Sequence, residues 1–477
     1  MESLPGEMIA EIGRYLSLAD VVACSATCRT WREMFNDDRI WRRRCTLRLA
    51  EYLEDTDTTV PPGLQLTEHD SLSPLCEWRI RFIRENHLWN NWRQGHFTMY
   101  HMVSAHGEEA NAVFYDNDYL VMLVYNEMTL WDIRGEPICL MTNPCDLDTA
   151  LLVDHFEILS EDRILLVQVS YVSVYRISVT SSHWPLIHAF YFDERLSTRD
   201  FSVYDAMSPG PREDGLVSMP QSCFYTVNGD YFLGVASGYA RLLHIWNIST
   251  GDKLKEVICP VSNPNSYFTN LYHSHKPSPD ILVLVEEDLR EEISFRAMVH
   301  LFVYDLSDMC FRAFVESRSG RVISIYKCMI YDPYVFIRDA CFMSIFNYKT
   351  FTLVDIMPAS SDPFIFNNNV IYSREAKYRE FDVSTGETEL LTDFNAYPTF
   401  FLACDRFIAQ VRGFLKFEVL EVGRREKDRC WVLCDTPRNQ YWLACKVATT
   451  NAMYTKRIII EFRADEYKRN IYLLNFW

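Results

Sequence analysis

Apolar and polar positions follow two different periods along the chain. In the first 50 residues, apolar side chains recur three or four positions apart, as at Met8, Ile12 and Leu16, which gives a helix one apolar face. From Phe97 onward, short runs rich in Val, Ile, Phe and Tyr are separated by Asp, Asn, Gly and Pro, which is typical of antiparallel strands. The pattern predicts a helical amino-terminal part followed by an all-β part.

The helical part carries start signals. Pro5 stands where a missing N–H costs least, and Ser17 with Asp20 has the spacing of a capping box. We expect a first helix after Pro5, a second over Leu18 to about Ala23 and a third over about Ser25 to Phe35. Helices in about 40 residues bury too little surface to close a core alone, so we expect a second protein to complete their apolar flank.

A polar loop and a further helix connect the two parts. Residues 54–74 are acidic and contain Pro61-Pro62-Gly63, which predicts a flexible loop. Residues 75–95 return to helical spacing, with Leu75, Trp78 and Phe82 on one stripe. A stiff helix at this place would fix the distance and angle between the two parts.

One phrase recurs through the all-β part: alternating apolar residues, then an aromatic residue, then a turn group. It occurs eight times, mostly at intervals of about 35 to 60 residues, close to the length of a β-propeller blade. This predicts a propeller of about eight blades, with seven as the alternative. The last phrase, YLLNFW, and the first strand, FTMYHMVS, are expected to share one blade, because that pairing closes the ring. The aromatic residues are Trp131, Tyr175, Trp246, Tyr304, Phe346, Phe381, Phe417 and Phe476.

Several residues of the helical part stand at characteristic spacings, namely Leu4-Pro5, Glu7, Ile12, Tyr15-Leu16, Asp20-Val21, Cys28-Arg29, Trp31 and Ile40-Trp41. This arrangement closely resembles the F-box. The resemblance implies binding to the Skp adaptor of SCF-type ubiquitin ligases and, through it, to cullin and RING subunits. It also implies which residues contact the adaptor or hold the helices that do: Leu4, Pro5, Met8, Ile9, Ile12, Leu16, Leu18, Val21 and Trp31.

The rest of the chain resembles F-box/WD-repeat proteins. Trp131-Asp132 and Trp246-Asn247 resemble the end of an eroded WD repeat, and residues 91–95 resemble the stretch that leads from the linker helix into the first strand. The resemblance implies an F-box over residues 1–50, a loop and linker helix over 51–96 and a WD-like propeller over 97–477.

Charge and composition narrow the range of partners. The net charge of −18 argues against a broad surface for nucleic acid or an anionic membrane. No run of 18 apolar residues predicts a membrane span. Fifteen scattered cysteines, an odd number, favour reduced thiols and therefore a cytoplasmic or nuclear location, or both.

Lysine is absent from the first half of the chain, because the first lysine is Lys253. One interpretation is a general preference for arginine. The other is that a ligase subunit benefits from having no acceptor amines near the catalytic machinery.

Motifs for catalysis and metal binding are missing from the sequence. It contains no GxSxG elbow, phosphate-binding glycine loop, HExxH or dinucleotide fingerprint. Cys24 and Cys28, like Cys430 and Cys434, lack the spacing of a zinc site, and we expect core thiols there. The sequence therefore predicts no enzyme, no cofactor and no metal.

Arginines near the turns of the all-β part are the candidates for substrate contact, since the planar guanidinium grips phosphate with two donors. The overall acidic charge disfavours an anionic ligand, so a need for phosphorylation stays open. The candidates are Arg241, Arg338, Arg379 and Arg412.

The resemblance implies a substrate-recognition subunit of an SCF-type ligase that holds a protein substrate and contributes no catalytic residue. Two alternatives are a scaffold without a role in ubiquitination and a propeller enzyme with a site in its channel. Activity that survives deletion of residues 1–95 would favour the enzyme.

Overall fold

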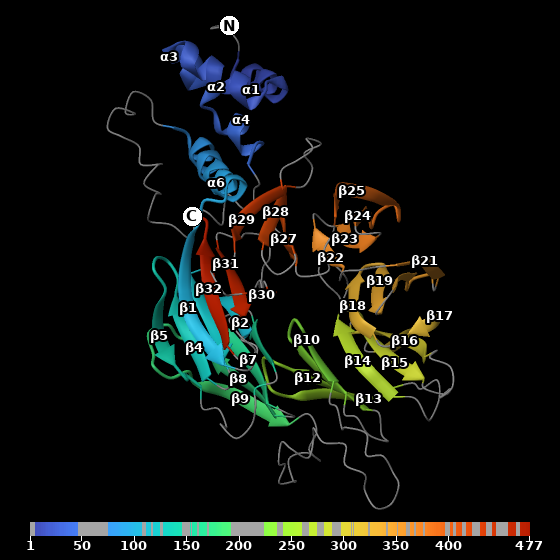
Figure 1. Cartoon of the computed structure of the whole chain (residues 1–477). Helices are drawn as coiled ribbons and strands as arrows, with labels where there is room; N and C mark the ends of the chain where they lie inside the picture. The colour runs from blue at the N-terminus through green and yellow to red at the C-terminus, as the bar shows by residue number, and fades with distance from the viewer. Residues whose placement is uncertain are drawn as a thin grey trace, which may run out of the picture.

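A computed structural model of the chain shows a group of helices set above a ring of sheets (Figure 1). The structure describes residues 5–45, 75–106 and most of 111–477; the longest stretches outside the described residues are 46–74, 192–223 and 445–456. The predicted loop at 54–74 therefore lies outside them, and so does the polar stretch 194–221, which the sequence predicts to be a loop inserted on one face of the propeller. None of the described helices has the length and apolar character needed to cross a bilayer.

The described residues of the amino-terminal part contain five helices: α1 (Gly6–Tyr15), α2 (Leu18–Thr27), α3 (Arg29–Phe35), α4 (Asp38–Arg42) and α6 (Glu77–Gln94). The predicted capping box is present, because Ser17 Oγ accepts from the Asp20 N–H at 3.2 Å and Asp20 Oδ2 accepts from the Ser17 N–H at 3.1 Å. The second helix is longer than predicted and the third starts later, since the chain becomes extended only at Cys28 (φ −156°).

The linker helix α6 ends on a glycine for a conformational reason. Gly95 takes φ 66°, which side chains with a Cβ rarely adopt. Its N–H donates to the Trp92 carbonyl at 3.4 Å, and the His96 N–H donates to the Asn91 carbonyl at 2.9 Å. These two bonds form a Schellman motif, which stops α6 directly before the first strand.

The strands form eight four-stranded antiparallel sheets within the described part of the chain. The first four contain, in order, β2 (Asn111–Tyr115), β3 (Tyr119–Val124), β4 (Glu127–Asp132) and β5 (Ile138–Thr142); β6 (His155–Leu159), β7 (Arg163–Gln168), β8 (Tyr171–Arg176) and β9 (Leu186–Tyr191); β10 (Phe224–Asn228), β11 (Tyr231–Val235), β12 (Leu242–Asn247) and β13 (Lys253–Ile258); and β14 (Tyr267–His273), β15 (Ile281–Asp288), β16 (Ala297–Asp305) and β17 (Cys310–Val322).

The next three sheets contain β18 (Ile325–Tyr331), β19 (Tyr334–Asp339), β20 (Phe342–Asn347) and β21 (Thr352–Pro358); β22 (Phe364–Phe366), β23 (Asn369–Arg374), β24 (Lys377–Phe381) and β25 (Thr388–Asn395); and β26 (Phe401–Ala403), β27 (Phe407–Arg412), β28 (Lys416–Glu421) and β29 (Cys430–Asp435). The last joins β1 (Thr98–His106) to β32 (Lys468–Asn475), β31 (Arg457–Arg463) and β30 (Tyr441–Ala444).

The first strands of successive sheets line the inside of the ring. The strand pairs β2 and β6, β10 and β14, β14 and β18, and β22 and β26 contact one another across sheet boundaries. This radial order of meandering sheets is that of a β-propeller. The predicted fold class, amino-terminal helices followed by a propeller, is confirmed.

The recurring aromatic phrase marks the third strand of every sheet. Trp131 lies in β4 and Tyr175 in β8, and the later phrases fall on β12, β16, β20, β24, β28 and β32, with Phe476 directly after the end of β32. Many of these side chains are buried, because the third strand packs against a neighbouring sheet. The repeat seen in the sequence is therefore a repeat of one strand position.

The ring closes because its first strand, β1, pairs with its last strand, β32, as predicted. β1 pairs antiparallel with β32 from Thr98 opposite Asn475 to His106 opposite Lys468. Apolar residues of β1, β3, β31 and β32 form one core between the last sheet and the first. This closure ties the strand after the linker helix to the carboxyl-terminal strand.

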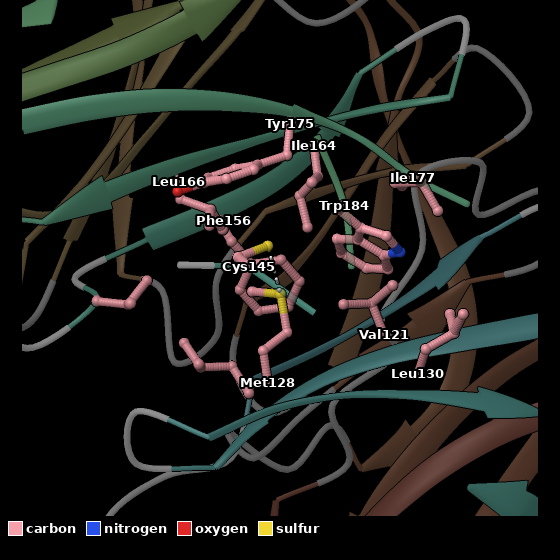
Figure 2. Packing of buried hydrophobic residues seen from close by; sticks show 12 residues of the cluster. Val121, Met128, Leu130, Cys145, Phe156, Ile164, Leu166, Tyr175, Ile177 and Trp184 are labelled. Atoms are coloured by element: carbon pink, nitrogen blue, oxygen red, sulfur yellow. Dashed lines mark hydrogen bonds between the residues drawn. The ribbon is translucent and has the colours of Figure 1, made fainter. Parts of the chain in front are cut away.

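Cores also fill the spaces between the sheets. Figure 2 shows the junction between the β2–β5 and β6–β9 sheets, where Met128 and Leu130 approach Phe156 and Trp184. The indole of Trp184 is fully buried, and its backbone N–H donates to the Pro144 carbonyl at 2.7 Å. Side chains that alternate along each strand thus serve two neighbouring junctions.

Candidate interaction sites on the helices and the propeller

The helices enclose a small apolar core of their own. Ile9, Val21, Ile40 and Trp41 are each at most 3% exposed. Trp41 donates its indole N–H to the Phe35 carbonyl at 2.8 Å. This core corrects one expectation: a second protein is not needed to cover Ile9, because other helices of the same chain already do so.

The linker helix completes that core. The ring of Phe82 lies 5.2 Å from the ring of Trp41, and the guanidinium of Arg79 lies 4.9 Å from the same ring. Trp78 also packs against the cluster. The sequence argument counted only the first 45 residues and missed this contribution, since α6 arrives from a distance of some thirty residues along the chain.

Two side chains before α6 bond to its first turn. Asn36 Oδ1 accepts from the Cys76 N–H and Asp38 Oδ1 accepts from the Trp78 N–H, both at 3.0 Å. Helix α6 has no cap from its own preceding side chain. Asp38 thus satisfies one of the free N–H groups of α6 and places a negative charge at the positive end of its dipole.

Helix α1 packs close to α4 and ends against an arginine. A Cβ on Gly13 would come within 3.3 Å of Ile40, so glycine permits the close approach. Arg44 donates to the carbonyls of Gly13 and Leu16 at 2.7 and 3.0 Å, which caps the last turn of α1. Partial burial lowers the pKa of Arg44 from its ordinary value.

Four apolar side chains of α1 and α2 remain exposed, and we call them the apolar face. They are Met8, Tyr15, Leu18 and Val22, exposed by 52, 83, 39 and 46%. Met8 and Tyr15 are seven residues apart in α1, and Leu18 and Val22 are four apart in α2, so each pair lies on one side of its helix. Exposed apolar side chains that lie on one side of a helix indicate a contact surface.

The nine residues predicted to serve adaptor binding fall into three groups. Pro5, Met8 and Leu18 are exposed, and Ile9 and Val21 are buried in the helical core. The half-buried members are Ile12, Leu16 and Trp31, while Leu4 lies outside the described residues. Sequence reasoning did not place Tyr15 or Val22 among the nine, although Tyr15 belongs to the F-box pattern itself.

Helix α6 is locked onto the propeller through the end of the chain. The rings of Trp92 and Phe476 stack 3.9 Å apart with planes 8° from parallel. Asn91 donates its side-chain N–H to the Phe476 carbonyl at 2.8 Å, and His87 meets Trp477 edge to face at 5.8 Å. Burial lowers the pKa of His87. The helix that closes the helical core therefore also rests on the ring.

The four predicted substrate arginines have different placements. Arg241 lies outside the described residues, and Arg412 ends β27 with a side chain that is also outside them. Arg338 in β19 and Arg379 in β24 are half-buried and belong to neighbouring sheets.

Arg338 and Arg379 face the same junction. Arg338 pairs with Met343 and Arg379 pairs with Tyr372, and directly paired residues project to the same side of a sheet. Met343 and Tyr372 belong to one buried cluster between the β18–β21 and β22–β25 sheets. Both arginines therefore extend from facing sheets toward a shared junction.

A third arginine joins them that sequence reasoning missed. Arg374 lies two residues after Tyr372 on the same face of β23, directly before the turn to β24. Burial raises the pKa of Tyr372, whereas its hydrogen bond with Thr388 and the charges of Arg379 and Arg374 lower it. The signal was available, since Arg374 has the same position before a turn that singled out Arg338.

The described residues contain no group of three or more His, Cys, Asp or Glu side chains that could bind a metal ion. The expectation of core thiols is wrong for Cys28, which is exposed between α2 and α3, while Cys24 is half-buried. Side chains of Cys430 and Cys434 lie outside the described residues.

Comparison with known proteins matches part of the chain to a family model and to curated proteins. The F-box-like family model matches residues 1–47. The F-box/WD repeat-containing protein 7 of Drosophila melanogaster is 26% identical over 91 residues, which is 19% of this chain and 6% of the relative. The chain thus matches only a small part of that protein's length.

Solved structures are similar to the chain at low identity, among them BamB and the Dos1 propeller. BamB from Moraxella catarrhalis has 8% identity and a TM-score of 0.42, covering 78% of this chain and 97% of its own. The Dos1 propeller has 8% identity and a TM-score of 0.48, covering 78% and 94%. The propeller assignment rests on the strand pairing of this chain.

Proposed function

The chain joins an F-box-like module to a β-propeller, as an F-box/WD-repeat protein does, and on this premise we propose that it is the substrate-recognition subunit of an SCF-type ubiquitin ligase. Its helices bind a Skp adaptor, which connects them to cullin and RING subunits. Its propeller binds the protein substrate. The chain positions the substrate and supplies no catalytic group.

The apolar face is the observation that carries the proposal. Met8, Tyr15, Leu18 and Val22 stay exposed, whereas Ile9 and Val21 on the same two helices are buried in the helical core. Complete burial of an exposed apolar side chain contributes about 1.5–3 kcal/mol, and covering the exposed part of each of these four contributes a fraction of that, before the costs of association.

The junction at Trp92 supports the positioning role. Because α6 belongs to the helical core at Phe82 and to the propeller contact at Trp92, one helix spans both parts. A substrate held by the propeller then keeps a limited range of distances from the ligase core. Restricting that range raises the effective concentration of the substrate near the conjugating enzyme.

The propeller offers the three arginines as a substrate contact. Arg338, Arg374 and Arg379 gather positive charge at one junction of a chain whose net charge is −18. We infer that they contact an acidic or phosphorylated segment of the substrate.

We also infer that each of the eight four-stranded sheets is one blade of the propeller.

Adaptor binding can be tested by charging the apolar face. The double variant Tyr15→Asp, Leu18→Asp changes two exposed side chains and should leave the helical core folded. We expect affinity for the purified Skp adaptor, measured by calorimetry, to fall by more than about tenfold, as for the centre of an interface. Ile258→Asp is the matched control, because Ile258 is 76% exposed on β13. Equal affinity of all three proteins would contradict the proposal.

Turnover separates a receptor from a scaffold. If the chain is a receptor, proteins bound by its propeller accumulate in cells when cullin activity is blocked. Binding of adaptor and clients with no change in client turnover would instead establish the scaffold.

A further inference from the structure

Arginine replaces lysine completely in one half of the chain. Residues 1–252 contain 19 arginines and no lysine, whereas residues 253–477 contain 17 arginines and 11 lysines. The lysine-free half includes all five described helices and the β2–β5 and β6–β9 sheets.

Some of these arginines form contacts that a lysine could not form. Arg39 grips the Asp37 carboxylate through Nε at 3.1 Å and Nη2 at 2.8 Å. Arg134 holds Asp132 in the same way, at 3.1 and 2.6 Å. A lysine has one nitrogen and cannot form this planar, two-point contact.

Other arginines have no such role. Arg29 is 85% exposed and makes one contact, with Glu33 at 3.1 Å, and Arg43 is 54% exposed and lies 3.7 Å from Glu11. Arg176 is exposed at the end of β8. Lysine has nearly the same helix propensity, and exposed ion pairs of either cation contribute little. Folding therefore does not account for the absence of lysine at these positions.

The remaining difference between the two side chains is reactivity. In ubiquitin transfer, a lysine amine attacks the thioester that joins ubiquitin to a cysteine of the conjugating enzyme. An amide bond forms, the carbon–sulfur bond breaks, and the sulfur leaves as a thiol with the proton that the amine gives up. A guanidinium stays protonated at physiological pH and does not act as this nucleophile.

We propose that the absence of lysine from the lysine-free half protects this chain from ubiquitination by its own ligase, an inference that rests on the proposed function. The first lysines, Lys253 and Lys255, are exposed on β13, which lies across the ring from the helices (Figure 1). Lysine resumes near the helices only in late strands such as β28, which carries Lys416 and contacts α6. Positive charge is thus kept on the helices and the early sheets while acceptor amines are confined to the later half.

The test restores amines at exposed positions. Full-length Arg43→Lys and Arg176→Lys variants are assembled with the Skp adaptor, cullin and RING subunits, and assembly is verified by gel filtration. Activating enzyme, conjugating enzyme and ubiquitin are then added, and modified peptides are mapped by mass spectrometry. We expect self-modification to rise severalfold, with ubiquitin on the new lysines. Arg43→Gln and Arg176→Gln, which lack the amine, should behave as the unchanged chain.

Two failures have different meanings. An assembled ligase that builds ubiquitin chains but leaves both new lysines unmodified overturns the protective role and leaves the proposed function intact. A chain that does not assemble with the adaptor overturns the proposed function, and this inference with it.

Discussion

Trp92 of the linker helix stacks flat on Phe476, the residue after the last strand, with ring centroids 3.9 Å apart. The two residues are far apart in sequence, and each belongs to a different closure: Trp92 to the helix that completes the helical core, Phe476 to the strand that closes the ring. One contact therefore connects the stability of both parts.

Replacing Trp92 by Ala should detach the helix from the ring. Truncating a fully buried tryptophan costs about 3–5 kcal/mol. We expect faster hydrogen exchange along α6 and in β32, measured by mass spectrometry, with little change in β7. Tyr15→Ala is the control, since Tyr15 is 83% exposed. Unchanged exchange in α6 would show that the stack does not hold the junction.

Trp184→Ala should weaken a junction within the ring. Trp184 is fully buried between the first two sheets (Figure 2), so the cavity should cost about 3–5 kcal/mol. The expected result is a lower midpoint of thermal unfolding by calorimetry, with adaptor binding unchanged. A loss of adaptor binding at a temperature where the ring stays folded would contradict the prediction that the helices bind the adaptor independently of this junction in the propeller.

The pair of Asp132 and Arg134 predicts an effect of acid on the ring. Hydrogen bonding to Arg134 holds the pKa of Asp132 below its usual value of 3.8. Because the folded-state pKa is lowered, the stabilisation is complete above the unfolded value and is lost as pH falls below it toward the folded-state pKa. Asp132→Asn should flatten the dependence of unfolding on pH below about 4. An identical acid profile for the variant would exclude a contribution of this pair.

Arg379 should show opposite effects on stability and binding. Its Nε is buried and makes no hydrogen bond within the part of the chain that the structure describes. Arg379→Met keeps an unbranched but shorter side chain and removes the charge, so thermal stability should stay equal or rise. Binding of a client first identified on the unchanged chain should fall, as measured by surface plasmon resonance. A less stable variant that binds the client equally well would make Arg379 a structural residue.

One local signal in the sequence predicted the start of a helix. The capping box at Ser17 acts within a few residues of its position and is present at the start of α2, whereas the end of that helix and the start of the next were predicted too early. The repeated aromatic phrase predicted the third strand of each sheet because each blade poses the same packing problem. Ring closure followed from the need to remove free edges.

The sequence by itself determined that helices precede a ring of antiparallel sheets, because hydrophobic period, caps and repeats depend on near neighbours. Only the tertiary structure decided which apolar residues stay exposed. Met8 and Ile9 are adjacent and equally apolar, yet one is 52% exposed and the other 2%. The difference arises because α3 and α4 pack against α1 on the side of Ile9. The segments that cover a helix come from elsewhere in the chain, and no local pattern encodes their approach.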